Sequence, residues 1–504
     1  MQSQPTPAPP ADAAVRIHWL GKKKIAADKN ATAFTQLWDM PESVKLEAQT
    51  LDKLSGAPWR LLFGETNQAS ANLLRPLLGD LVEEETFVEV RKSTNSPDGD
   101  DEMILAIRLN DERAGLWRTN LAVVLQSLTH IAPEESSTTG RWFLKKHHAP
   151  NLIEFVRAGE WVVVGAAQDH NKLLGEILAR IERDHAPFSA SPTNFWLEVD
   201  IDPSRTSILR AHLPAAFPKI SFNVTGDGKN VVTRGQVNFS EAVPFVSESW
   251  KVPTNFIAAD LSSFTATRMG MQKLLSPMWK QFETNLPPNQ LYVWSNDGIP
   301  MQTYFAAPFA DASNAVSRLT DFVIAKSGTW FATNDMIRFQ RAKNFNGLEW
   351  KGMPYIAPFI KSAEVSGQGF ILGGFFPLTG TNQSAPQQLL QPLRDRANLV
   401  YYDWELTGSR LEQWTYITQL LRILMGKPEL PPDSVAIKWL QAMSARLGPS
   451  STEIICNNDR EFSFTRTANV PFTAIELHLL LDWTESPKFP SAEAFPLLSH
   501  FREY

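Results

Sequence analysis

Residues 220–239 read ISFNVTGDGKNVVTRGQVNF, and this stretch predicts the elementary unit of the fold. Apolar and polar side chains alternate in Ile220–Val224 and again in Val231–Phe239, which is the period of a strand with one buried face. Between them, Gly226-Asp227-Gly228-Lys229 is a strong turn signal. The stretch is therefore predicted to be an antiparallel hairpin. Two more hairpins follow the same pattern, at Leu291–Ser295 with Met301–Ala306 and at Glu453–Cys456 with Phe462–Thr465.

Outward from these hairpins, an alternating apolar strand recurs five times and gives way each time to a helical pattern. The five predicted strands are Val15–Leu20, Met103–Leu109, Phe195–Ile201, Phe256–Leu261 and Leu399–Leu406. Helical spacing of three and four residues is clearest in Leu411–Met425 and Phe472–Trp483. The sequence thus predicts an α+β protein of tandem strand–helix–hairpin–helix modules, in which helices cover antiparallel-rich sheets and the modules form two or three lobes.

Polar, Pro and Gly residues cluster at the expected boundaries between these modules. After a flexible leader at 1–14, we expect modules at 15–95, 101–188, 193–250, 255–328 and 398–504. The region 330–396 interrupts the rhythm because it is rich in Gly, Pro, Phe and Asn. We interpret it as irregular strands and loops, which suits a degenerate unit.

Two sets of residues flank the last apolar residue of each predicted strand. The residues that follow it belong to the class that turns a chain or caps a helix, and capping is preferred to catalysis because Gly, Ser and Thr share the position with acids. They are Gly21, Asn110, Asp202, Ser262 and Thr407. The residues that precede it are Trp19, Arg108, Asp200, Asp260 and Glu405. Their three carboxylates could line one face of a sheet, but a solvated outer face predicts the same charges and is preferred.

Composition narrows the possible partners. The net charge is −6, from 48 basic and 54 acidic side chains, so no basic face is expected and nucleic-acid binding is disfavoured. Cys456 is the single cysteine, which excludes an intramolecular disulfide and a multi-cysteine metal site. No apolar run is long enough for a transmembrane segment. The 16 tryptophans could form sugar- or peptide-binding platforms, although filling of irregular cores is the preferred interpretation.

Motif searches single out no catalytic residue, and the sequence predicts no cofactor and no metal. Gly367, Gly369 and Gly373 miss the spacing of a dinucleotide loop by one residue. His147 and His148, with Asp169 and His170, form the densest group of potential zinc ligands. Adjacent side chains on a strand point to opposite faces, which argues against a shared ion. Acids also stand beside tryptophan in Glu349-Trp350 and Asp403-Trp404-Glu405, as they often do in sugar sites and in any amphipathic strand.

The N-terminal residues 2–14, QSQPTPAPPADAA, have the composition of a flexible leader left after removal of a signal peptide. Two segments resemble a family of exported bacterial proteins of unknown function, whose tandem modules open with a short apolar strand and a helix. They are Phe256–Leu261 with the helix that follows it, and Glu160–Gly165 with the helix after Asp169. The resemblance covers about half of the chain, implies an extracytoplasmic location and offers no catalytic residues.

The first functional hypothesis is a non-enzymatic exported protein that binds another protein or a component of the cell envelope, because modular units form extended surfaces. The alternatives are an envelope hydrolase whose carboxylates converge only in the fold, and small-ligand capture in a cleft lined by tryptophan. An enzyme should show an enclosed pocket with at least two polar groups of perturbed pKa. A binding protein should instead show an exposed apolar or aromatic patch.

Overall fold

A computed structural model was obtained for the chain, and it describes most of the residues from 13 to 491. The described ranges are 13–92, 101–137, 140–145, 152–168, 170–188, 195–206, 217–243, 246–257, 260–297, 302–330, 338–352, 356–378, 387–394, 396–424, 431 and 433–491. The leader expected at 1–14 lies almost entirely outside them, as do His147, His148 and Asp169.

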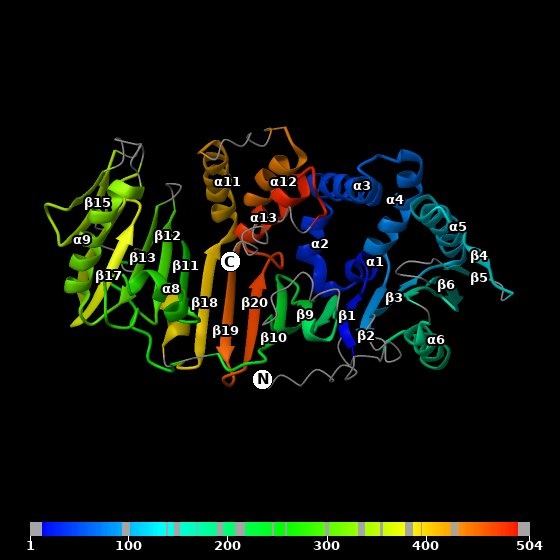
Figure 1. Cartoon of the computed structure of the whole chain (residues 1–504), viewed down its shortest axis with the longest axis horizontal. Coiled ribbons are helices and arrows are strands. Elements are labelled where there is room, and N and C mark those ends of the chain that lie inside the picture. The colour runs from blue at the N-terminus through cyan, green and yellow to red at the C-terminus, as the bar shows by residue number, and fades with distance from the viewer. Residues whose placement is uncertain are drawn as a thin grey trace.

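All of the described strands join one 20-stranded sheet in which every neighbouring pair is antiparallel (Figure 1). The first ten strands are β1 (Ala13–Trp19), β2 (Thr86–Lys92), β3 (Asp101–Arg108), β4 (Glu134–Glu135), β5 (Arg141–Lys145), β6 (Leu152–Ala158), β7 (Trp161–Ala167), β8 (Leu197–Ile201), β9 (Lys219–Gly226) and β10 (Val231–Asn238). The second ten are β11 (Leu261–Thr267), β12 (Leu291–Asn296), β13 (Thr303–Pro308), β14 (Arg338–Arg341), β15 (Gly347–Lys351), β16 (Phe359–Val365), β17 (Gln368–Gly374), β18 (Leu399–Leu406), β19 (Pro449–Cys456) and β20 (Glu461–Ala468).

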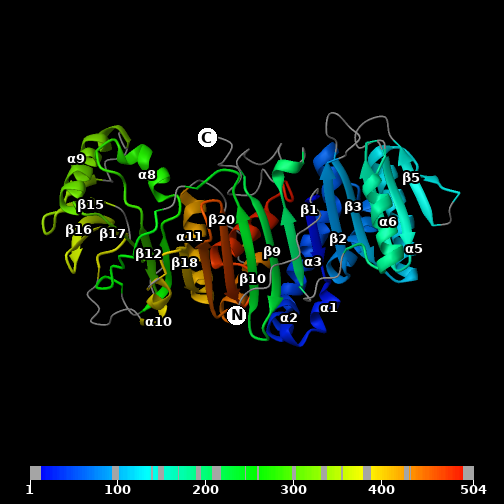
Figure 2. The ribbon, with the colours of Figure 1, turned by 90° about the horizontal axis from the view of Figure 1, so that it is seen from below.

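Helices connect the strands and cover the sheet (Figures 1 and 2). Those between β1 and β10 are α1 (Lys22–Ala26), η1 (Lys29–Ala31), α2 (Thr32–Trp38), α3 (Pro41–Phe63), α4 (Gln68–Glu83), α5 (Asp111–Thr129), α6 (Lys172–Asp184) and η2 (Pro203–Arg205). Those after β11 are α8 (Met271–Trp279), α9 (Ala312–Trp330), α10 (Gln387–Leu390), η3 (Gln391–Leu393), α11 (Thr407–Leu424), α12 (Val435–Ser444) and α13 (Ala474–Glu485). The α+β class and the helix-covered antiparallel sheet predicted from the sequence are confirmed. The proposed module boundaries stay predictions.

The strand pairings are arranged alike on the two sides of the β10–β20 pair. Outward from β10 the order is β9, β8, β1, β2, β3, β7, β6, β5, β4; outward from β20 it is β19, β18, β11, β12, β13, β17, β16, β15, β14. The register also shifts at the same place, between Ala13 and Val15 in β1 and between Leu261 and Ser263 in β11. Residues 13–238 (the N-terminal half) and 261–485 (the C-terminal half) are therefore topologically equivalent, joined along β10 and β20.

The region 330–396 contains β14–β17, which occupy the place that β4–β7 occupy in the N-terminal half. One strand prediction was wrong. Of the predicted strand Phe256–Leu261, the described residues 256, 257 and 260 are not in a strand, and β11 begins at Leu261 where the predicted strand was to end. The strand was misplaced because β11 carries Ser or Thr at alternate positions. One face of β11 is therefore polar, and its sequence lacks the apolar run of a typical strand.

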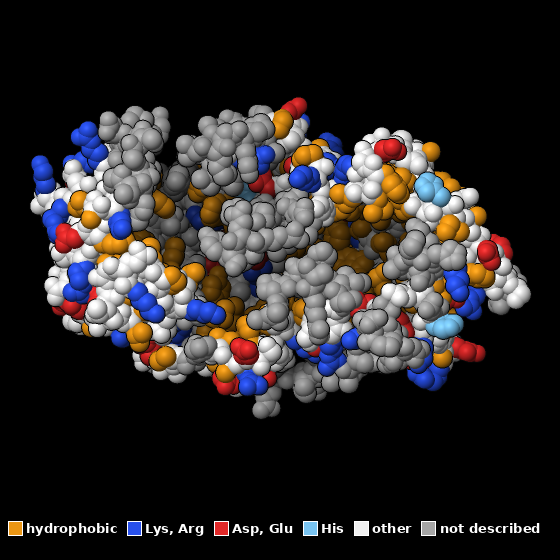
Figure 3. Space-filling model, in the orientation of Figure 1, with side chains coloured by type: hydrophobic (Ala, Val, Ile, Leu, Met, Phe, Trp, Pro, Cys, Tyr) orange, Lys and Arg blue, Asp and Glu red, His pale blue; other side chains and the backbone are white. Residues whose placement is uncertain are grey.

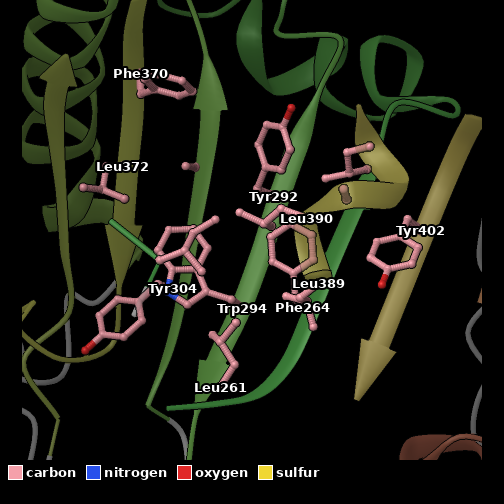
Figure 4. Close-up of a cluster of buried hydrophobic side chains, with 14 of the residues drawn as sticks. Leu261, Phe264, Tyr292, Trp294, Tyr304, Phe370, Leu372, Leu389, Leu390 and Tyr402 are labelled. Atoms are coloured by element: carbon pink, nitrogen blue, oxygen red, sulfur yellow. The ribbon is translucent and has the colours of Figure 1, made fainter. Parts of the chain in front are cut away.

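Apolar clusters lie on both faces of the sheet. The face here called the helix face carries α1–α5, α8, α9 and α11–α13, with Leu77, Ile107 and Trp117 among the buried contacts of the N-terminal half. The reverse face carries α6 over Phe87 and Val163, and α10 and η3 over the C-terminal half. The largest cluster lies there. Figure 4 shows its aromatic side chains, including Phe264, Tyr292, Trp294, Tyr304 and Tyr402, packed with Leu389 and Leu390.

Tryptophans fill these cores. Those that are buried are Trp59, Trp117, Trp142, Trp161, Trp196, Trp279 and Trp294. The remaining tryptophans whose side chains the structure describes are half-buried, and none of them is exposed. Core filling, the preferred interpretation of the tryptophan content, accounts for the described copies.

Candidate binding site on the helix face

The middle of each half exposes part of the helix face of the sheet. In the C-terminal half, Ser263, Thr265 and Thr267 of β11 are half-buried on this face, whereas Phe264 and Ala266 on the reverse face are fully buried. Figure 3 shows a hollow in this half between the regions of α9 and α11, and a second hollow in the N-terminal half in the region of α1 and β3. The helix-face residues of equivalent strands differ in character between the two halves.

Two carboxylates of β18, Asp403 and Glu405, point to the helix face in the C-terminal half. Their positions on the strand differ by two, so both side chains emerge on the same side. The Thr265 hydroxyl donates to Asp403 Oδ1 at 2.6 Å. The backbone N–H of Ala474, the first residue of α13, donates to Glu405 Oε1 at 2.8 Å. This N–H and the helix dipole behind it favour a negative charge on Glu405.

Burial nevertheless dominates the ionisation of both acids. Glu405 is only 5% exposed. Burial raises its pKa to about 7, and the neighbouring Asp403 charge adds to the rise, while the Ala474 N–H and Arg410 oppose it. Burial also raises the pKa of Asp403, against the Thr265 hydrogen bond and the charge of Arg466. Both carboxyls therefore bind protons more tightly than exposed acids do.

Two arginines stand beside this pair. Arg410 is buried, its Nη1 donates to Gln413 Oε1 at 2.6 Å, and its guanidinium lies 5.3 Å from the Trp414 ring centroid. Its Nε has no hydrogen-bond partner among the described residues. Arg466 forms a bidentate pair with Glu476 of α13, with N–O distances of 2.6 and 3.0 Å. These charged groups join β18 and β20 to α11 and α13, so they hold helices on the sheet as well as shaping a polar surface.

The equivalent helix-face positions of the N-terminal half carry apolar side chains. The pairing of Ile17 with Val199 corresponds to that of Thr265 with Asp403, and Val15 with Ile201 corresponds to Ser263 with Glu405. The floor continues through β2, β3 and β7, where Val88, Met103, Leu105, Val164 and Ala166 lie on this face. We define the apolar floor as Val15, Ile17, Val88, Met103, Leu105, Val164, Ala166 and Ile201.

All members of the apolar floor are at least half-buried except Met103, which is 42% exposed. Hydrophobic atoms line the bottom of the N-terminal hollow in Figure 3. An aliphatic floor can accept apolar groups, whereas the equivalent positions of the C-terminal half carry Asp403 and the buried Glu405.

The residues predicted to cap helices behave in three ways. Asn110 and Asp202 cap α5 and η2 by accepting the N–H of Arg113 and Ser204, so capping is confirmed for both. Gly21 precedes α1 at φ 90° with no side chain to accept a bond.

The capping prediction was wrong for Ser262 and Thr407. Ser262 is buried at the register shift of β11, where its hydroxyl donates to the carbonyls of Ser295 and Asn296. Thr407 is the first residue of α11, and its hydroxyl bonds to the Ser450 hydroxyl across 3.0 Å. Both hydroxyls satisfy groups on neighbouring strands, which local sequence does not reveal.

The prediction of a solvated outer face holds for some of the flanking residues. Asp260 is exposed, and the exposed Arg108 bonds to Glu160 at 2.9 Å, whereas the Asp200 side chain is only 15% exposed and lies 3.5 Å from Lys219 Nζ. It was wrong for Glu405, which α13 covers. The helix that buries it begins 69 residues later in the chain, so no nearby residue signals the burial.

Two other candidates contribute little to this surface. His170, the described member of the histidine group, is exposed, and within the described ranges no three His, Cys, Asp or Glu side chains are placed to hold a metal. A cavity of about 480 Å³ lies between the β6–β7 turn and α6, lined in part by Glu160, Trp161 and His185. Asp403 and Glu405 are not among the residues that line it.

No family model, curated protein or solved structure matches the chain. None of the described helices combines the length and apolar character that crossing a bilayer requires.

Proposed function

We propose that this chain is a non-enzymatic, exported binding protein of the cell envelope, and that its apolar floor holds the hydrocarbon part of an envelope component. The observation that carries the proposal is the partly exposed floor of aliphatic side chains on β8, β1, β2, β3 and β7. The resemblance of Phe256–Leu261 and Glu160–Gly165 to a family of exported bacterial proteins supports the extracytoplasmic location.

Hydrocarbon suits this floor better than a peptide does. The backbone groups of the floor strands are already paired within the sheet, from Val15 with Ile201 to Met103 with Ala166. A peptide lying on aliphatic side chains would leave its own N–H and C=O groups without partners, at a cost of a few kcal/mol each. A hydrocarbon chain carries no such groups and gains about 25 cal/mol for each Å² of apolar surface removed from water.

A fluorescence titration with cis-parinaric acid, a fatty acid that emits when its chain enters an apolar site, tests the proposal. Because Met103 is already 42% exposed, Met103→Glu should fold while placing a charge at the edge of the floor. We expect at least tenfold weaker binding in this variant. Val123→Glu is the matched control, since Val123 is 47% exposed on α5. Absence of binding by the unaltered protein, or equal binding by Met103→Glu and the unaltered protein at equal Tm, would refute the proposal.

The acid pair favours one second candidate, an envelope hydrolase. A carboxyl with a pKa of about 7 can donate a proton near neutral pH, and Asp403 lies two positions away on the same strand. If this is the function, hydrolysis of chromogenic ester or glycoside substrates should fall at least a hundredfold in Asp403→Asn. Activity that survives in this variant at unchanged stability would exclude the acid pair as the catalytic site.

A further inference from the structure

A second exposed apolar surface surrounds α8. Four large exposed side chains lie on α8 and in the segments that flank it: Met269, Leu274, Met278 and Leu286, which are 37%, 73%, 53% and 72% exposed. We call this set the α8 surface. Leu274 and Met278 are four residues apart on the helix, so they project on the same side. Figure 2 shows α8 at the margin of the molecule beside α9.

The helix that carries these side chains is firmly anchored. Trp279 is buried in a cluster with Ala312 and Val316 of α9, and its indole N–H donates to the Asn285 carbonyl at 2.9 Å. Glu283 Oε1 accepts from the Asn285 backbone N–H at 3.1 Å. The side chain of Gln272 donates to the Pro287 carbonyl at 3.3 Å, which ties the loop carrying Leu286 to the first turn of α8. The apolar side chains are thus held outward by a fixed helix and loop.

The exposed charged side chains of α8 and its flanking loop are all positive. Residues 269–290 contain three charged side chains, Lys273, Lys280 and Glu283. Both lysines are exposed, whereas Glu283 is 3% exposed and bonds to Arg318 of α9, with an Nε–Oε2 distance of 3.1 Å. The exposed charge of residues 269–290 is therefore positive, although the chain as a whole carries −6.

We propose that the α8 surface binds the interfacial layer of an anionic lipid bilayer. Leu274, Met278 and Leu286 enter the boundary between headgroups and acyl chains. Lys273 and Lys280 remain at the level of the phosphates. This arrangement of apolar side chains on one side and lysines beside them is that of helices that lie in a membrane surface.

A lipid surface fits this chemistry better than a protein partner does. Lysine is depleted in protein interfaces because its ammonium loses water there, and Lys273 lies directly beside Leu274. At a bilayer the lysine stem lies along apolar surface while its ammonium stays hydrated among phosphates. The nine-residue helix is too short to span a bilayer, which leaves it in the interface.

Sedimentation with large unilamellar vesicles tests this inference on the full chain. We expect binding to vesicles of equal phosphatidylglycerol and phosphatidylcholine, and at least tenfold weaker binding to phosphatidylcholine alone. Leu274→Ser with Met278→Ser should weaken binding to the anionic vesicles at least tenfold, and Lys273→Gln with Lys280→Gln should abolish the preference for them. Because all four side chains are exposed, these variants should keep the Tm of the unaltered protein.

Leu62→Ser is the control, because Leu62 is 68% exposed at the C-terminal end of α3 and lies outside the α8 surface. It should bind the anionic vesicles as the unaltered protein does. The inference is overturned if the unaltered protein stays in the supernatant, or if the Leu62 and α8 variants lose binding equally. Met103→Glu should leave vesicle binding unchanged, so the apolar floor and the α8 surface can fail independently.

Discussion

Replacing Glu405 by glutamine should stabilise the protein at alkaline pH and leave its stability unchanged at acidic pH. The carboxyl is 5% exposed, and its pKa rises from an ordinary 4.5 to about 7 in the folded chain. Below pH 4.5 the group is protonated in both the folded and the unfolded chain, so its ionisation does not affect folding. Between pH 4.5 and 7 the unfolded chain releases the proton first, and stability falls as the pH rises.

The size of the effect follows from the pKa difference. Each tenfold change in the ionisation constant corresponds to about 1.4 kcal/mol, so the penalty above pH 7 is about 3 kcal/mol. Glutamine removes the charge, and its side-chain oxygen can still accept the N–H of Ala474. For cooperative unfolding of a chain of this length, the gain corresponds to a rise in Tm of about 3 °C.

Calorimetry at pH 8.5 and pH 4.5 checks the prediction. We expect Glu405→Gln to raise Tm at pH 8.5 and to match the unaltered protein at pH 4.5. Glu364→Gln, which alters an exposed glutamate of β16, should be neutral at both. A lower Tm of Glu405→Gln at pH 8.5 would refute the reasoning, because it would mean that Ala474 and Arg410 stabilise the carboxylate more than burial destabilises it.

Two further predictions concern the tight backbone position of Gly21 and the helix cap of Asn110. They add to the predictions already made for the apolar floor and the α8 surface. Gly21→Ala should destabilise the protein by about 3 kcal/mol in urea unfolding, because φ is 90° and a Cβ would lie 2.6 Å from the Glu84 carbonyl carbon. Gly56→Ala, at an open site within a helix, should instead stabilise it by about 0.5 kcal/mol. Equal effects of the two substitutions would contradict this expectation. Asn110→Ala should lower the free energy of unfolding by about 1 kcal/mol, because it removes the hydrogen bond to the Arg113 N–H. Asn110→Asp should retain most of the stability, since its carboxylate can accept the same N–H. No loss in the alanine variant would show that the cap is dispensable.

The hairpins were predictable because their determinants are adjacent in the chain. The turn at 226–230 joins β9 to β10, with Asp227 accepting the N–H groups of Lys229 and Asn230, as expected for this turn chemistry. The cap of α5 was predictable for the same reason, since Asn110 needs only the next three residues. The alternating pattern and the three- and four-residue spacing likewise placed β18 and α13 within a few residues of their observed bounds.

The candidate sites were not predictable in the same way. Nothing near Glu405 indicates that α13 will cover it. A glutamate at this position of the strand is compatible with a solvated face of the sheet as well as with a buried one. Leu274 and Met278 are the opposite case, because an apolar pair at helical spacing normally faces a core, whereas here Met271 and Trp279 are the buried residues of the helix. In both places the partner that decides burial comes from a remote segment.

By itself, the sequence determined the α+β class, the hairpins and the caps formed by Asn110 and Asp202, because turn residues and hydrophobic periodicity act within a few positions of the chain. Only the tertiary structure decided that β1 pairs with β8 and that β10 pairs with β20, which unites the two halves in one sheet. It also decided that equivalent strands carry an apolar floor in one half and the Asp403–Glu405 pair in the other. The physical reason is that hydrogen bonding between strands is the same for any sequence, so the choice of neighbour depends on burial summed over segments hundreds of residues apart.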